Sequence, residues 1–223
     1  MSARPVRVLI GSAACAMAFA LAPAPVAQAA SSPGWRVVFT HRYQSSTVGS
    51  GYVAVTSPSK TAAWAVGGAG GNGNPATGRP VAARWLHGKW QAVSLPRGLS
   101  GLLFAVSADS AKDVWAISLA GGYLLRWNGI RWAVARRWPT HGLRSALTGV
   151  TAPSPSNVWV FGPPGAFPGV GTWHFNGHSW QHVTIGSLLR IALVPGTTSL
   201  WGAGSAQAKP VAKAAVWARG RIG

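Results

Sequence analysis

Acidic side chains are almost absent from this chain. Its 223 residues include two Asp and Glu residues against 20 Lys and Arg residues, a formal net charge of +18. The two acids are Asp109 and Asp113, which lie in one short segment. Glycoside hydrolysis normally needs two carboxylates that flank the bond, a Ser–His–Asp triad needs an oriented acid, and calcium sites collect several acids. The sequence therefore argues against these kinds of site, and we predict no catalytic, cofactor-binding or metal-binding residue.

Cysteine occurs once, as Cys15, inside the apolar run of residues 8–22. Two arginines precede this run and the small-residue sequence Ala27-Gln28-Ala29 follows it, which is the plan of a secretory signal peptide. The run is shorter than the roughly 20 residues of a membrane-spanning helix, although a retained anchor is the alternative. We predict a signal peptide over 1–29 and an exported domain over 30–223, secreted or held in the cell envelope, without disulfides or integral membrane association.

Long apolar runs with a helical period are also missing, whereas 29 glycines, 16 prolines and 13 tryptophans are present. The aromatic residues recur at intervals of 42 to 55 residues in three series. The series are Trp64, Trp115, Trp159, Trp201; Trp85, Trp127, Phe175, Trp217; and Trp35, Trp90, Trp132, Trp180. A regular period of this length is typical of repeat folds such as propellers.

Each repeat is predicted to form four short antiparallel strands. Asn128-Gly129 and Asn176-Gly177 are strong signals for a two-residue hairpin turn in which both positions have positive φ. A short hydrogen-bond acceptor stands two residues before the first tryptophan of three repeats, and alanine replaces it in the first repeat. These residues are Ala62, Asp113, Asn157 and Ser199.

The fold class that follows is all-β and β-propeller-like, with four repeats of about four antiparallel strands. The segment Trp35–Phe39 matches a fourth strand without the three before it, and the segment after Trp217 lacks a fourth strand. The N-terminal strand is therefore predicted to complete the last blade and close the ring, which would remove exposed sheet edges. An open series of four units that closes only through oligomerisation is the alternative. Most indoles are predicted to fill the gaps between the sheets.

The pattern resembles secreted bacterial propeller-like proteins with "DVWAVG…RWDG..W" units, which are similar to kelch, galactose-oxidase-type and sialidase-type propellers. The resemblance covers residues 35–223 and is carried by four short motifs. They are Asp113-Val114-Trp115-Ala116, Asn157-Val158-Trp159-Val160, Arg126-Trp127-Asn128-Gly129 and Phe175-Asn176-Gly177. The sialidase Asp-box and the kelch double glycine are not reproduced, so the resemblance implies a fold and no particular activity.

Basic side chains are the remaining candidates for a site. Arg84, Arg126 and His174 directly precede the third-strand aromatic residue of successive repeats, and such equivalent positions project in equivalent directions. A second group lies near the junction of the second and third repeats and comprises Arg131, Arg136, Arg137 and Arg144. Together they are the predicted anion-binding residues. A solvated polar face is the alternative interpretation.

The charge favours two functions. A strongly basic exported module is attracted to polyanions, which predicts a non-enzymatic binding module for an anionic cell-wall polymer or polysaccharide. A composition with few carboxylates equally suits a structural, acid-tolerant envelope protein, because acid unfolding depends mainly on protonating carboxylates. A propeller-scaffold enzyme is the third alternative. No base-reading helix or RNA-binding sheet motif occurs, so specific nucleic-acid recognition is not predicted.

Overall fold

The computed structural model describes residues 34–41, 43, 50–71, 76–139, 147–162, 171–184, 187–194, 196–206 and 213–220. The chain divides into two compact units, Met1–Val37 and Val38–Gly223. The predicted signal peptide lies outside the described residues, and so does Arg144. The described residues form strands and turns and contain no helix.

Within the second unit, the described residues form fifteen strands in four antiparallel sheets. The first sheet comprises β1 (Ser50–Ser59), β2 (Ala62–Ala69), β3 (Arg79–Leu86) and β4 (Lys89–Val93). The second comprises β5 (Leu103–Ser110), β6 (Asp113–Ser118), β7 (Tyr123–Trp127) and β8 (Trp132–Arg137). The third comprises β9 (Gly149–Ser154), β10 (Asn157–Phe161), β11 (Thr172–Phe175) and β12 (Trp180–Val183). The fourth comprises β13 (Ser187–Leu193), β14 (Leu200–Ala206) and β15 (Lys213–Arg219).

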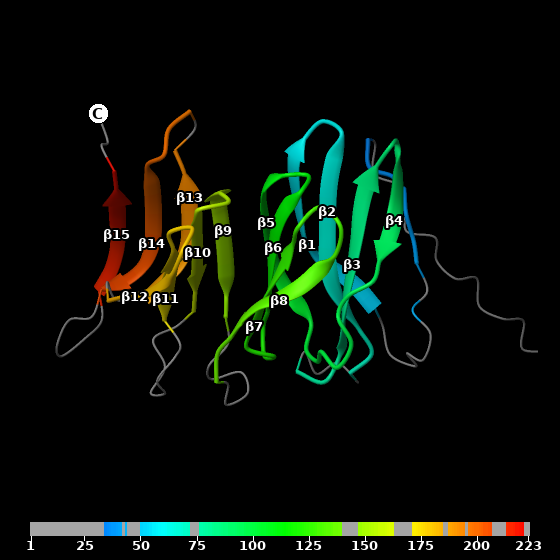
Figure 1. Ribbon diagram of the computed structural model, residues 1–223, viewed down its shortest axis with the longest axis horizontal. Coiled ribbons are helices and arrows are strands. Elements are labelled where there is room, and N and C mark those ends of the chain that lie inside the picture. The colour runs from blue at the N-terminus through cyan, green and yellow to red at the C-terminus, as the bar shows by residue number, and fades with distance from the viewer. Residues whose placement is uncertain are drawn as a thin grey trace, which may run out of the picture. The chain divides into compact units, whose positions relative to one another are not determined.

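In every sheet the strands pair in chain order, so each repeat is an antiparallel meander of the kind that makes a propeller blade. The first strands of neighbouring sheets pack together, β1 against β5, β5 against β9 and β9 against β13. Figure 1 shows the four sheets following one another in this order. No comparable packing joins the strands described for the first sheet to those described for the last. The prediction of an all-β, propeller-like fold with four repeats is confirmed.

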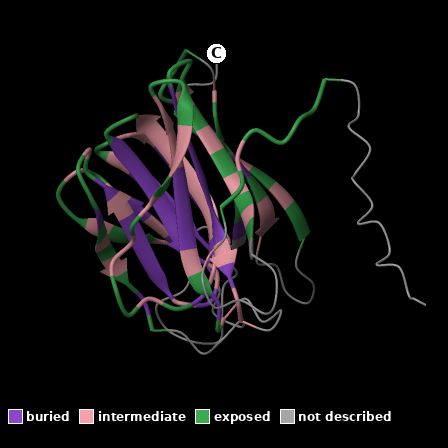
Figure 2. Cartoon of the chain, turned by 90° about the vertical axis from the view of Figure 1, so that its right-hand side faces the viewer, coloured by how far each residue is buried: buried purple, intermediate pink, exposed green. Residues whose placement is uncertain are grey.

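Indoles of the first tryptophan series fill the gaps between the sheets. Trp64 in β2 is 2% exposed, and its ring centroid lies 4.9 Å from that of Trp127 and 5.2 Å from that of Trp132 in the second sheet. Trp115 in β6 packs in the same way on the third sheet. Figure 2 shows that buried residues concentrate within the strands and exposed residues on the loops. Such aromatic pairs add about 0.5–1.5 kcal/mol each to the gain from burial.

The hairpin turns differ from the prediction for Asn128-Gly129. Gly129 has φ of +94°, whereas Asn128 does not have a positive φ and instead stands before the central residues of the turn. Its Oδ1 accepts hydrogen bonds from the amides of Ile130 at 3.0 Å and Arg131 at 2.9 Å. Asn176 makes the same pair of contacts in the third sheet. The side-chain acceptor thus stabilises a longer turn than the one predicted.

A two-residue turn with positive φ at both positions occurs in the first sheet. It joins β3 to β4 through His87, with φ of 50°, and Gly88, with φ of 78°. Leu86 pairs directly with Lys89 across it. The turn signals taken from the sequence were Asn-Gly pairs, so this His-Gly turn was missed, although histidine is among the residues that adopt positive φ more often than most.

The predicted closing strand that begins at Trp35 is not present. The described residues 34–41 contain no strand, and the last sheet has three strands. The Phe39 ring lies 6.2 Å from the ring of Tyr52 and 6.3 Å from that of Trp90, both in the first sheet. Phe39 therefore packs on the first sheet, and the described N-terminal residues form no hydrogen-bonded strand beside the last sheet. This part of the prediction was wrong.

The last repeat is also shifted relative to the aromatic series. Trp217 pairs with Gly202, one residue after Trp201, whereas Trp127 pairs with Val114, one residue before Trp115. The position equivalent to Trp127 is therefore occupied by Arg219, which pairs with Leu200. The alignment of Trp217 with Trp127 was therefore wrong by two residues.

Close backbone contact between β1 and β2 predicts a position that accepts only glycine. A Cβ atom added to Gly67 would lie 1.9 Å from the carbonyl oxygen of Gly51. We expect Gly67→Ala to destabilise the fold by about 3 kcal/mol through overpacking, and to lower the unfolding midpoint by about 10 °C. Thermal unfolding followed by circular dichroism measures this. Gly51→Ala is the control, because its Cβ would have no heavy atom within 4 Å, and an equal loss in both variants would contradict the explanation.

Candidate functional site

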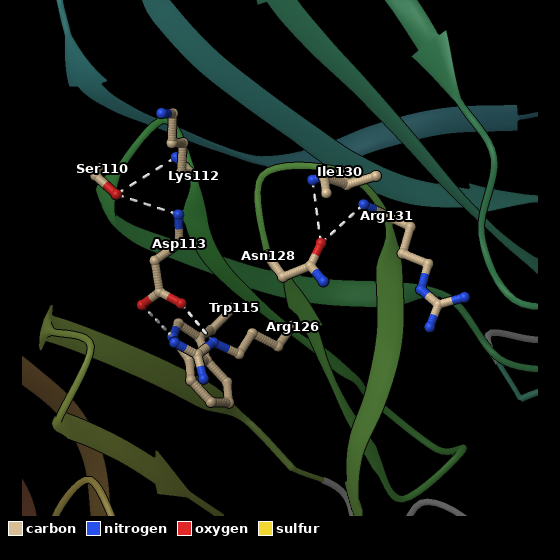
Figure 3. Close-up of polar contacts among 8 residues, drawn as sticks. All are labelled: Ser110, Lys112, Asp113, Trp115, Arg126, Asn128, Ile130 and Arg131. Atoms are coloured by element: carbon tan, nitrogen blue, oxygen red, sulfur yellow. Dashed lines mark hydrogen bonds and ion pairs between the residues drawn. The ribbon is translucent and has the colours of Figure 1, made fainter.

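The acceptor two residues before each first-series tryptophan organises a repeated polar cluster. In the second sheet the Asp113 carboxylate accepts a hydrogen bond from Trp115 Nε1 at 2.9 Å and forms an ion pair with Arg126. Figure 3 shows both side chains converging on this carboxylate. The Arg126 guanidinium carbon also lies 4.8 Å from the Trp115 ring centroid, a cation–π distance. Ser110 Oγ accepts a hydrogen bond from the backbone N–H of Asp113 at 3.1 Å, and this bond stabilises the turn that precedes the carboxylate.

The third sheet builds the same cluster without charge. Asn157 Oδ1 accepts a hydrogen bond from Trp159 Nε1 at 2.8 Å and one from His174 Nε2 at 3.0 Å. The His174 ring stacks on Trp159 with centroids 4.3 Å apart. Because the amide oxygen of Asn157 only accepts hydrogen bonds, Nε2 of His174 is the donor in this contact. Burial, and then the positive charge of Arg219, lower the pKa of His174 below its ordinary value.

Alanine removes the acceptor from the first sheet. Arg84 pairs with Trp64 across the ladder, as Arg126 pairs with Trp115 in the second sheet. Because Ala62 stands where Asp113 stands in the second sheet, Arg84 Nε is buried without a hydrogen-bond partner among the described residues. Its guanidinium carbon lies 5.5 Å from the ring centroid of Trp127. Arg84 is thus stabilised by the aromatic face of Trp127 in place of a carboxylate.

The structure places the predicted basic positions in equivalent slots. Arg84, Arg126 and His174 each stand opposite the first-series tryptophan of their sheet. They point into the gaps between sheets, and Arg126 and His174 are already engaged by Asp113 and Asn157. Anion binding by these three residues stays a prediction.

The second predicted group is spread along β8. Arg131 is exposed on the hairpin turn before this strand, and Arg137 is exposed at its far end. Between them, Arg136 is half-buried, and burial lowers its pKa. Its guanidinium carbon lies 4.4 Å from the ring centroid of Trp173 and 5.1 Å from that of Trp138. Arg136 therefore packs among indoles and does not form one cluster with Arg131.

A groove of about 770 Å³ lies at one end of the first sheet. It is lined by the end of β2 and the start of β3, by the connection after β4 and by His41 and Tyr43. Arg79 and Arg97 both line it and both are exposed. Neither acidic residue of the chain is among its lining residues. The groove therefore offers an anion two exposed guanidinium groups and no acidic side chain.

Sequence reasoning did not single out Arg79 or Arg97. One signal was available, because the glycine-rich segment of residues 67–80 predicts a long loop between strands, and long propeller loops often carry binding sites. Gly70 and Gly71 of that segment have φ of 72° and 85° and line the groove beside Arg79. Nothing in the sequence connects Arg97 to this loop, since the contact depends on the path of the chain after β4.

A second cavity of about 330 Å³ separates the third and fourth sheets. Trp159 lines it from the third sheet, and Trp217 and Arg219 line it from the fourth. In the two preceding gaps, an indole from a fourth strand, Trp132 or Trp180, contacts the first-series tryptophan. The fourth sheet has three strands, so no described indole takes that place.

Two features are absent from the described part of the chain. It holds no helix with the length and hydropathy that a membrane crossing requires. It also brings together no three His, Cys, Asp or Glu side chains that would hold a metal ion.

No family model matches this sequence, and no curated protein matches it. A solved structure described as "YCF48 bound to D1 peptide" is similar to the chain with a TM-score of 0.48 and 12% identical residues. The similarity covers 74% of this chain and 54% of that chain, so this chain spans about half the length of the protein that it matches. Such a distant likeness identifies no function.

The polar cluster of the second sheet predicts the effect of removing its carboxylate. Asp113→Ala leaves Trp115 Nε1 without its acceptor and Arg126 without its ion pair. We expect a loss of about 2 kcal/mol in the free energy of unfolding, mainly because the buried Trp115 N–H loses its acceptor, whereas the Arg126 side chain is 37% exposed and can be hydrated. Asp113→Asn should cost about 1 kcal/mol, since Asn157 shows that an amide oxygen can accept two such bonds. Urea unfolding of the two variants tests this, and equal losses would contradict it.

The lowered pKa of His174 predicts a pH dependence of stability. Below pH 6.5 the unfolded chain binds a proton at this residue more readily than the folded chain does, so the free energy of unfolding falls as the pH falls from about 6.5 through the folded pKa. Urea unfolding between pH 7.5 and 5 should show this decline. His174→Gln should flatten it, whereas His178→Gln, on an exposed turn, should not. An unchanged decline in His174→Gln would assign it to another group.

Proposed function

We propose that this protein is an exported, non-enzymatic binding module with a propeller-like fold that binds an anionic polymer of the cell exterior, such as a wall polymer or an acidic polysaccharide. The observation that carries the proposal is the groove of the first sheet. Two exposed arginines, Arg79 and Arg97, line it, and no carboxylate lines it to neutralise them. Guanidinium groups bind carboxylate, sulfate and phosphate oxygens through paired N–H donors.

The charge of the whole chain supports this assignment. The two acids lie in the second sheet region, and Asp113 is paired with Arg126. The other described cations have no carboxylate within ion-pair distance. A surface of this kind attracts polyanions at long range, and the groove would supply the short-range contacts. Polyanion binding of this type weakens as salt concentration rises.

Retention on a sulfated polysaccharide column tests the proposal. The protein should bind at about 50 mM salt and elute with increasing salt, because Debye screening weakens exposed charge contacts. Arg79→Ala combined with Arg97→Ala should weaken binding about tenfold, at about 0.7 kcal/mol for each exposed contact. The matched control is Arg190→Ala combined with Lys213→Ala, which removes the same charge from exposed positions of the last sheet.

The control separates the groove from the net charge. Equal weakening in both double variants would show that binding follows total charge, and the groove would lose its assigned role. Absence of retention at low salt would overturn the proposal as a whole. A neutral polysaccharide column of the same mesh serves as the blank.

A further inference from the structure

The gaps between sheets repeat one aromatic contact. Trp64 of the first sheet packs on the pair Trp127–Trp132, and Trp115 of the second sheet packs on the pair Phe175–Trp180. In each case, a tryptophan from a second strand meets two aromatic rings that face each other across the third and fourth strands of the next sheet. Both tryptophans are 2% exposed.

The last sheet has the second-strand tryptophan of this contact, but no following sheet is described that would supply the aromatic pair. Trp201 stands at the equivalent place in β14 and is 42% exposed. Trp201 pairs with Ala218 and Val216 pairs with Ala203, so strand alternation puts Trp201 and Val216 on the same face. Val216 is 70% exposed. This outer face of the last sheet, defined by Trp201 and Val216, is called the tail face below.

The first sheet has an aromatic pair of the kind that receives such a tryptophan. Trp85 and Trp90 face each other across β3 and β4 with ring centroids 6.1 Å apart and an interplanar angle of 60°. The pair Trp127–Trp132, which receives Trp64, has corresponding values of 6.0 Å and 57°. Val55 is 69% exposed and pairs with Ala65. Ala63, two residues before Ala65, pairs with Trp85. Strand alternation therefore puts the side chains of Val55 and Trp85 on the same face of the sheet. We call this the head face, defined by Val55, Trp85 and Trp90.

We propose that the tail face of one molecule docks on the head face of a second copy, with Trp201 seated on the Trp85–Trp90 pair as Trp64 is seated on Trp127–Trp132. The occupant is a second copy because this chain itself presents the matching surface, in the geometry that two of its own inter-sheet gaps already use. Within one molecule, the described strands of the first and last sheets do not pack together as neighbouring sheets do.

Two different faces meet in this contact, so the association is heterologous and continues until a ring closes. Phe39 already packs on Tyr52 and Trp90 at 6.2 and 6.3 Å, so its ring covers part of the head face, and Trp201 of a second copy would approach the pair from the side of Trp85. The net charge of +18 opposes association between copies. Added salt should therefore strengthen self-association through screening, whereas it weakens polyanion binding. The two properties respond to salt in opposite directions, so either can fail without the other.

Sedimentation velocity of the purified full chain at 0.5 M salt tests the proposal. The wild-type protein should form concentration-dependent dimers or larger assemblies. Trp201→Ala should weaken association about thirtyfold, as expected for an aromatic residue at the centre of an interface. Val216→Lys and Val55→Lys should leave monomers, because each places a charge in one of the two faces. All three positions are exposed enough to be changed without loss of the fold, which far-ultraviolet circular dichroism confirms.

Mixing provides the decisive measurement. Val216→Lys retains an intact head face and Val55→Lys an intact tail face, so an equimolar mixture should form dimers although each variant alone is monomeric. Ile130→Lys, 82% exposed on the second sheet's hairpin turn, is the matched control and should associate like the wild type. A mixture that stays monomeric, or a wild-type protein that is monomeric at every concentration and salt, would overturn the proposal.

Discussion

The packing of one second-strand indole across each inter-sheet gap is the interaction on which this fold depends. A four-stranded meander of this size cannot bury both of its faces by itself. Trp64 and Trp115 solve the problem by covering a pair of aromatic rings on the next sheet, at centroid distances of 4.9 to 6.3 Å. Where the receiving pair is incomplete, as opposite Trp159, a cavity of about 330 Å³ remains. The same requirement leaves Trp201 exposed at the end of the series.

Each of these indoles also has a polar N–H group that must be satisfied when the ring is buried. The residue two positions earlier performs this task with a carboxylate at Asp113 and an amide at Asn157. It thereby decides what can stand opposite the indole. The carboxylate holds a charged Arg126, and the amide holds His174, whose pKa is lowered by burial. The residue two positions before the indole therefore affects both the burial of the indole and the charge of the side chain opposite it.

The repeat, the strand content and the packing role of most indoles could be predicted, because the period and the aromatic spacing are visible along the chain. The shift of Trp217 could not be predicted, since the register between β14 and β15 does not follow from the aromatic spacing. The path of the N-terminal segment was also missed. Trp35–Phe39 has the pattern of a fourth strand, yet Phe39 packs on Trp90 of the first sheet. The groove escaped prediction because Arg79 and Arg97 are brought together only by the folded chain.

Because the chain has only two acidic residues, most arginines that lie between the sheets are stabilised by aromatic rings and not by carboxylates. Arg84, Arg136 and Arg219 lie over the rings of Trp127, Trp173 and Trp159 at 5.5, 4.4 and 4.6 Å. An aromatic face attracts a cation through its quadrupole but carries no net charge. Tryptophan therefore stabilises guanidinium groups between the sheets without neutralising them. A protein that used carboxylates for the same task would lose most of its positive field. Here the structural solution preserves that field, and the groove with Arg79 and Arg97 stays electrostatically available to an anion.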